Sequence, residues 1–131
     1  MTWQGAGWVA LGGAIGSVLR YLTVVIAAQR FGTGFPWGTL AVNVAGSFAI
    51  GAIAEWAAGG FLGVTPTVRL FVATGVLGGF TTFSSFSLDA LSLLRDGNTL
   101  LALGYVAGSV LLGLGSAYAG MIAARLISPH G

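Results

Sequence analysis

The stretch Gly78-Gly79-Phe80-Thr81-Thr82-Phe83-Ser84-Ser85-Phe86 decides how this chain folds, because it interrupts an apolar segment running from Val68 to Leu94. Glycine disfavours a helix by about 1 kcal/mol relative to alanine, and Ser and Thr side chains compete for backbone hydrogen bonds. We therefore expect a break here. A broken backbone at membrane depth is tolerated only inside protein or beside a water-filled cavity. The stretch thus indicates either an ion site, built from freed carbonyls and hydroxyls, or a Ser/Thr-rich contact between helices.

The composition identifies an integral membrane protein. Of the 131 residues, 56% are hydrophobic and 6% are charged, whereas soluble domains carry roughly 25% charged residues. The net charge of +2 is too small to indicate a nucleic-acid partner, and none is expected. There is no cysteine, which excludes a disulfide framework and a thiolate metal site. The 23 glycines suit helices that pack closely through small side chains.

Four apolar segments are each long enough to cross a bilayer, which takes about 20 residues. We expect an all-α membrane protein whose residues 1–131 form a single four-helix transmembrane domain. The third helix should be broken near its middle. The connections between the segments are short and rich in Gly, Pro or polar residues, as turns are. The expected spans are 8–28, 37–58, 68–94 and 100–124.

The arginines give almost no signal for the orientation of the chain. With four spans, Arg69 and Arg125 lie on the side of the two termini, and Arg30 and Arg95 lie on the other. Two arginines on each side leave no difference in positive charge for the positive-inside rule to act on. We therefore expect insertion in both orientations and an antiparallel, dual-topology dimer. The alternative is that Arg20 or another feature fixes one orientation.

The polar residues inside the spans are neutral hydrogen-bond donors. A spacing of four residues places Thr39 and Asn43 on one face of the second span, and Tyr105 and Ser109 on one face of the fourth. The hydroxyls of residues 81–85 lie at the expected break. Such groups either replace the water around an anion or hydrogen-bond one helix to another. Both interpretations stay open from the residues alone.

Arg20 and the glycines of the outer spans have simple interpretations too. Arg20 follows Gly12 and Gly16 by one turn on the same face. It either faces a vestibule, where it would concentrate anions, or extends to the interface and anchors the helix. Gly104 and Gly108 predict a small-residue packing face on the fourth span.

The acidic residues and the histidine exclude two classes of protein. Glu55 and Asp89 are expected near span ends, so the chain lacks the mid-membrane acid that a proton-coupled cation pump normally needs. His130 is the single histidine, and no His/Asp/Glu cluster can be assembled around it. We therefore expect that the protein is not an enzyme.

Three motifs resemble the Fluc (CrcB) fluoride channels of bacteria, and the resemblance covers all four spans. The motifs are residues 12–21 (GGAIGSVLRY), residues 38–47 (GTLAVNVAGS) and residues 78–87 (GGFTTFSSFS). In the fourth span Tyr105 and Ser109 fit the family. Gly113 lacks a hydroxyl that some relatives carry there.

The resemblance implies a multi-pass, fluoride-selective channel of the bacterial inner membrane that exports fluoride. The channel would be a homodimer with two antiparallel pores. A structural Na⁺ at its centre would be bound by the backbone carbonyls of Gly78 and Thr81. Phe83 and Phe86 would line the pores. Asn43, Tyr105 and Ser109 would be the hydrogen-bonding residues of the pore, and Arg20 would lie near its vestibule. The polar residues of the spans add Thr39, Thr82 and Ser85 to the expected ion pathway.

Two other functions compete with this one. A small multidrug-type transporter also has four spans and dual topology, but it should carry a Glu in the first span, where this chain has Arg20. A non-transporting structural subunit of a membrane complex would use its polar faces only to hold helices together. Fluoride efflux from proteoliposomes distinguishes all three.

Overall fold

The computed structural model describes residues 2–128, and His130 lies outside them. Within this range four helical segments are long and apolar enough to cross a membrane, which confirms that part of the predicted fold class. Each predicted span lies inside one of them, while the single-domain assignment stays a prediction. The segments are α1 (Trp3–Phe31), α2 (Trp37–Gly59), the third segment (Pro66–Arg95) and α6 (Thr99–Ile127).

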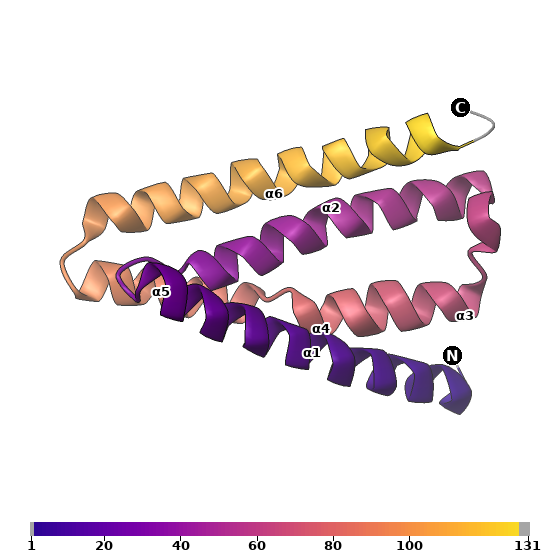
Figure 1. The fold of residues 1–131 in the computed structure, drawn as a ribbon, viewed down its shortest axis with the longest axis horizontal. Helices are drawn as coiled ribbons and strands as arrows, with labels where there is room; N and C mark the ends of the chain where they lie inside the picture. Colours follow the sequence, from indigo (N-terminus) through magenta and orange to yellow (C-terminus); the bar gives the residue numbers. More distant parts are fainter. Residues whose placement is uncertain (1, 129–131) are drawn as a thin grey trace.

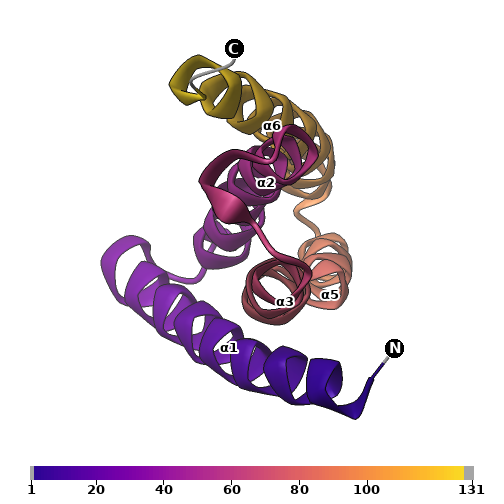
Figure 2. The same cartoon turned by 90° about the vertical axis from the view of Figure 1, so that its right-hand side faces the viewer.

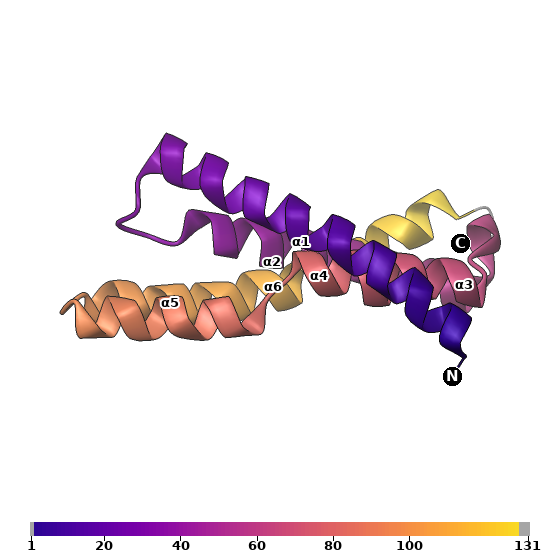
Figure 3. The same ribbon diagram turned by 90° about the horizontal axis from the view of Figure 1, so that it is seen from below.

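The third segment is broken near its middle, as predicted (Figures 1 and 3). Thr81 (ψ 159°) and Thr82 (φ −155°) are extended, and a new helix starts after them. Gly78 and Gly79 are themselves helical, so the break lies at the threonine pair rather than at the glycine pair. The parts of the segment are α3 (Pro66–Arg69), the π-helix η2 (Leu70–Leu77), α4 (Gly78–Phe80) and α5 (Phe83–Arg95). A short 3₁₀ turn, η1 (Phe61–Gly63), precedes it.

Helix α1 packs directly on the backbone of η2 and α4. A Cβ atom at Gly12 would overlap the carbonyl oxygen of Phe71, and one at Gly16 would overlap that of Val76. A Cβ at Gly79 would lie 2.5 Å from the carbonyl oxygen of Gly13. These glycines therefore serve close helix approach rather than backbone flexibility.

Helices α2 and α6 lie side by side along most of their length (Figures 1 and 2). Gly51 and Gly120 face the partner backbone so closely that a Cβ at either would overlap a carbonyl oxygen; for Gly51 this is the carbonyl of Ala117. The predicted packing face of α6 is wrong for the single chain, because a Cβ at Gly104 or Gly108 would have no neighbour within 4 Å. Packing uses the other half of α6, where small residues meet α2.

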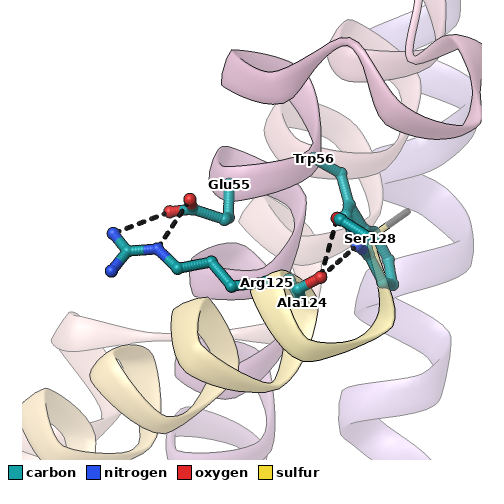
Figure 4. Close-up of polar contacts among 5 residues, drawn as sticks. All are labelled: Glu55, Trp56, Ala124, Arg125 and Ser128. Carbon is teal, nitrogen blue, oxygen red and sulfur yellow. Dashed lines mark hydrogen bonds and ion pairs between the residues drawn. The ribbon is translucent and has the colours of Figure 1, made fainter. Parts of the chain in front are cut away.

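The C-terminal ends of α2 and α6 are joined by polar contacts (Figure 4). Arg125 donates from Nε to Glu55 Oε1 at 2.7 Å and from a terminal nitrogen to Oε2 at 3.2 Å. The indole N–H of Trp56 donates to the Ala124 carbonyl at 3.3 Å, and the hydroxyl of Ser128 donates to the same carbonyl at 2.8 Å. The two ends of the described chain lie on this side of the molecule, as four crossings require (Figure 1).

Seen from the end, α1 and α6 lie on opposite sides, with α2 and the third segment between them (Figure 2). Fully buried side chains are few, and many large apolar side chains on all four segments are exposed. An apolar exterior is what a lipid environment demands. Phe83, directly after the break, is among these exposed side chains.

Candidate functional site

Asn43 of α2 pairs with the broken backbone through both ends of its side-chain amide. Its Oδ1 accepts a hydrogen bond from the Thr82 N–H at 2.7 Å, and its Nδ2 donates to the Thr82 carbonyl at 2.9 Å. One residue on a neighbouring helix thus satisfies both backbone groups of Thr82. This contact fixes Thr82 in its extended conformation and joins α2 to the break.

The two threonines of the break cap the helices on either side. Thr82 is the N-cap of α5, and its Oγ1 accepts the Ser85 N–H at 3.1 Å. Thr81 ends the preceding helix, with its N–H and its hydroxyl both donating to the Leu77 carbonyl at 2.9 Å. The break is therefore a capped, specified feature rather than a frayed helix.

A groove of about 390 Å³ lies at the break, and we call it the central groove. It brings together seven of the predicted site residues, from α2, the third segment and α6. Phe83 is 79% exposed in the single chain, so the groove is open to the surroundings. The predicted residues that line it are Asn43, Gly78, Thr81, Thr82, Phe83, Phe86 and Ser109, and Gly113 lines it without a hydroxyl.

Aromatic rings lead away from the central groove along α5. The ring centroids of Phe83 and Phe86 are 5.6 Å apart, and those of Phe86 and Tyr105 are 5.2 Å apart. On the opposite wall, the hydroxyl oxygen of Ser109 is buried and has no hydrogen-bond partner among residues 2–128. The groove therefore combines aromatic rings with an unsatisfied hydroxyl.

A second cavity, the end cavity, has a volume of about 290 Å³. Tyr105 lines neither cavity, but its ring packs against Phe86 of the central groove and against Phe35 of the end cavity. The tyrosine is 1% exposed, and its hydroxyl donates to Asp89 Oδ2 at 3.3 Å. Asp89 and Thr39 both line the end cavity, which lies between the α1–α2 connection and the end of α5. Asp89 lies in α5, toward the C-terminal end of the third segment as expected, and it is partly buried.

The remaining predicted pathway residues lie elsewhere. Ser85 contributes its backbone N–H to the Thr82 cap, and it lines neither cavity. Arg20 is partly exposed on α1 and also lines neither cavity. Sequence reasoning missed Asp89, although its spacing of three from Phe86 repeats the spacing between Phe83 and Phe86. That period places all three on one face of α5.

These features define a multi-pass membrane protein with a broken helix and a groove of neutral polar and aromatic groups. Residues 2–128 contain no group of three or more His, Cys, Asp or Glu side chains that could bind a metal ion. The chain belongs to the CrcB family, because the model of the CrcB-like, Camphor Resistance (CrcB) proteins matches residues 7–121. This confirms the resemblance drawn from the three motifs.

Several curated bacterial proteins are similar over nearly their whole length. A fluoride-specific ion channel FluC of Rhizobium meliloti (strain 1021) is 52% identical over 117 residues, covering 89% of this chain and 93% of that protein. Two further proteins of the same name are similar. That of Hyphomonas neptunium is 51% identical over 91% of this chain and 94% of its own length, and that of Opitutus terrae is 56% identical over 89% of each.

Proposed function

We propose that this chain is a fluoride-selective channel that exports fluoride across a bacterial cell membrane. The observation that carries the proposal is a sequence identity of about 50% to proteins named fluoride-specific ion channels. It covers about nine-tenths of the chain. The family match at residues 7–121 includes the break and both cavities' polar side chains. An ion channel also agrees with the expectation that the protein is not an enzyme.

The chemistry of the central groove suits a small, strongly hydrated anion. A pore must replace the water around fluoride with several donors, yet bind it weakly enough to release it. Asn43 and Ser109 are neutral donors, and only one of the two amide hydrogens of Asn43 is used by Thr82. The buried Ser109 hydroxyl without a partner costs about 1–3 kcal/mol unless a ligand satisfies it. An anion in the groove would accept from it.

The ion path we propose runs from the central groove past Phe86 and Tyr105 to the end cavity at Thr39. The edges of aromatic rings carry the positive end of the ring quadrupole and can face an anion. Phe83 and Phe86 lie in series along this route, and the Tyr105 ring packs between Phe86 of the central groove and Phe35 of the end cavity. Asn43, Ser109 and Thr39 offer polar hydrogens along this route, and the phenylalanines offer ring edges.

The channel is a homodimer in this proposal, and a second copy covers the central groove. Phe83 is largely exposed and Gly78 is exposed in the single chain, although both lie beside broken backbone. Broken backbone does not face lipid at membrane depth, because its polar groups would lack partners. The even arginine count favours an antiparallel second copy, and such a dimer would carry two antiparallel pores.

A structural Na⁺ at the dimer centre completes the proposal. Gly78 and Thr81 both line the central groove, and each carbonyl has lost the N–H donor that a continuous helix would give it. Two copies around a two-fold axis bring four such oxygens together, and oxygen ligands suit a hard cation. The ion would offset the repulsion among these carbonyls.

Fluoride efflux from proteoliposomes, read with a fluoride electrode, tests the function. The expected result is fast fluoride efflux whose rate does not saturate as the fluoride concentration rises. Chloride efflux from matched liposomes should be negligible. A structural subunit would give no efflux of either ion. A multidrug-type transporter would instead move organic cations against a proton gradient. That result would show that the protein is a transporter and not a channel.

Topology is tested by substitutions at the ion pair of Figure 4. Arg125→Gln leaves Arg69 alone against Arg30 and Arg95, so the chain should shift toward placing its termini outside the cytoplasm. Glu55→Gln is the matched control and should shift the orientation little, since acids contribute little to the positive-inside rule. A pair of C-terminal reporters, one active in the periplasm and one in the cytoplasm, measures the ratio. A single, unmoved orientation in all three proteins would remove the antiparallel dimer.

A further inference from the structure

The hydrogen bonds around the break leave the carbonyls of Gly78 and Thr81 without their helical donors. In an α-helix each N–H donates to the carbonyl four residues earlier. The N–H groups of Thr82 and Ser85 are therefore the natural donors to the carbonyls of Gly78 and Thr81. In the structure both are diverted to side chains: Thr82 N–H to Asn43 Oδ1 at 2.7 Å, and Ser85 N–H to Thr82 Oγ1 at 3.1 Å.

We propose that Asn43 and the Thr82 hydroxyl are positioning residues for the central cation. They occupy the two N–H groups and so keep the carbonyls of Gly78 and Thr81 free for the ion. This inference rests on the Na⁺ site of the proposed function. It assigns to Asn43 a role besides donating to fluoride, and to Thr82 a role besides lining the groove.

The amide of Asn43 is suited to this role because it works at both ends. Its oxygen takes the Thr82 N–H while its nitrogen donates to the Thr82 carbonyl at 2.9 Å, so the contact is self-complementary. An apolar residue of the same size would leave both groups of Thr82 unsatisfied in a partly buried place. The Thr82 N–H would then form the helical hydrogen bond to the Gly78 carbonyl, and that bond would compete with the cation for the same oxygen.

The same amide connects the two ion sites. Asn43 lines the central groove beside Phe83 and Phe86, and it also holds the backbone that presents the cation-binding carbonyls. Binding of the cation and the geometry of the anion path are therefore coupled through one side chain. A change at Asn43 that keeps its acceptor but alters its charge should separate the two effects.

The test is the Na⁺ dependence of thermal unfolding of the purified protein in detergent, with N-methylglucamine replacing Na⁺ at constant ionic strength. Binding to the folded state raises the Tm as Na⁺ saturates its site. We expect Asn43→Leu and Thr82→Val to raise the half-saturating Na⁺ concentration by about tenfold or more, since each restores a helical hydrogen bond that competes with the ion. Thr82→Ser, which keeps the hydroxyl, is the matched control and should stay within about twofold of wild type.

Asn43→Asp separates the cation site from the anion path. The carboxylate loses the donor to the Thr82 carbonyl, but it can still accept the Thr82 N–H, which is the bond that keeps the Gly78 carbonyl free. The Na⁺ midpoint should therefore stay within a few-fold of wild type. Its negative charge in the groove should abolish fluoride efflux. Wild-type midpoints in both Asn43→Leu and Thr82→Val would overturn the positioning role. A wild-type Tm indifferent to Na⁺ would overturn it together with the cation site, while wild-type fluoride efflux, measured separately, would leave the channel function standing.

Discussion

The contact of α1 with the π-helix predicts that two neighbouring glycines respond to alanine with opposite signs. A Cβ at Gly16 would overlap the Val76 carbonyl oxygen, lie 2.9 Å from the Val76 carbonyl carbon and 2.8 Å from the Phe80 nitrogen. A Cβ at Gly13 would have one neighbour, the Gly75 oxygen at 4.0 Å. The first site is backbone against backbone, and the second has room.

The magnitudes follow from these distances. Ordinary contact begins at 3.4 Å, so Gly16→Ala must move α1 away from the third segment by at least half an ångström. Overpacking of this kind costs about 1–3 kcal/mol, and the rigid carbonyl places Gly16→Ala at the upper end. Gly13→Ala gains up to about 1 kcal/mol of helix propensity. We therefore expect a net loss of about 2 kcal/mol for the first variant and a neutral or positive change for the second.

The measurement is the Tm of each purified variant in detergent, followed as the intact peak on gel filtration after heating. Gly16→Ala should lower the Tm by several degrees, because about 1 kcal/mol corresponds to roughly 2–8 °C for small domains. Gly13→Ala should leave it unchanged or raise it. Equal Tm values for the two variants would show that α1 does not touch the π-helix as the structure describes.

Three further predictions concern the groove. If Phe83 and Phe86 only fill space, Leu should serve nearly as well, because volume-conserving swaps cost under about 1.5 kcal/mol. We expect instead that the double Leu variant forms dimers but loses most fluoride efflux. Full efflux in this variant would show that both residues serve packing alone. Ser109→Ala removes an unsatisfied hydroxyl, so the Tm should hold or rise while efflux falls, and undiminished efflux would exclude Ser109 from the path. Thr81→Ser keeps its backbone carbonyl and should keep the Na⁺ dependence of the Tm, whereas loss of that dependence would point to the side chain.

The fold was predictable from the sequence where it depends on the residues of one segment alone. Apolar length gave the four spans, and the Ser/Thr-rich stretch gave the break, since both depend on the segment's own residues. The exact place of the break was not predictable, because it depends on contacts with other helices: Gly79 is helical and packs on α1, while Asn43 of α2 pairs with the extended Thr82. The π-helix before the break has no signal in its own apolar residues.

The site was predictable to the extent that spacing reports a shared helix face. Thr39 and Asn43 lie on one face of α2 as expected, yet they belong to different cavities. Asp89 was not predicted as a cavity residue because it was considered only for its distance from a span end, and not for the face of α5 that it shares with Phe86. Arg20 and Ser85 line neither cavity of the single chain, so their place in the ion pathway stays a prediction.

One broken helix can serve ions of opposite charge because a break treats donors and acceptors differently. Each interruption frees both N–H and C=O groups, and side chains at the break, from Asn43 and Thr82, take up the N–H groups. The carbonyls of Gly78 and Thr81 remain, and they favour a cation. The anion is then left to side-chain hydrogens and ring edges farther along the groove, at Ser109 and the phenylalanines. In the proposed channel the cation and anion sites are therefore neighbours without sharing a ligand atom, which would let the cation stay bound as part of the structure while the anion moves.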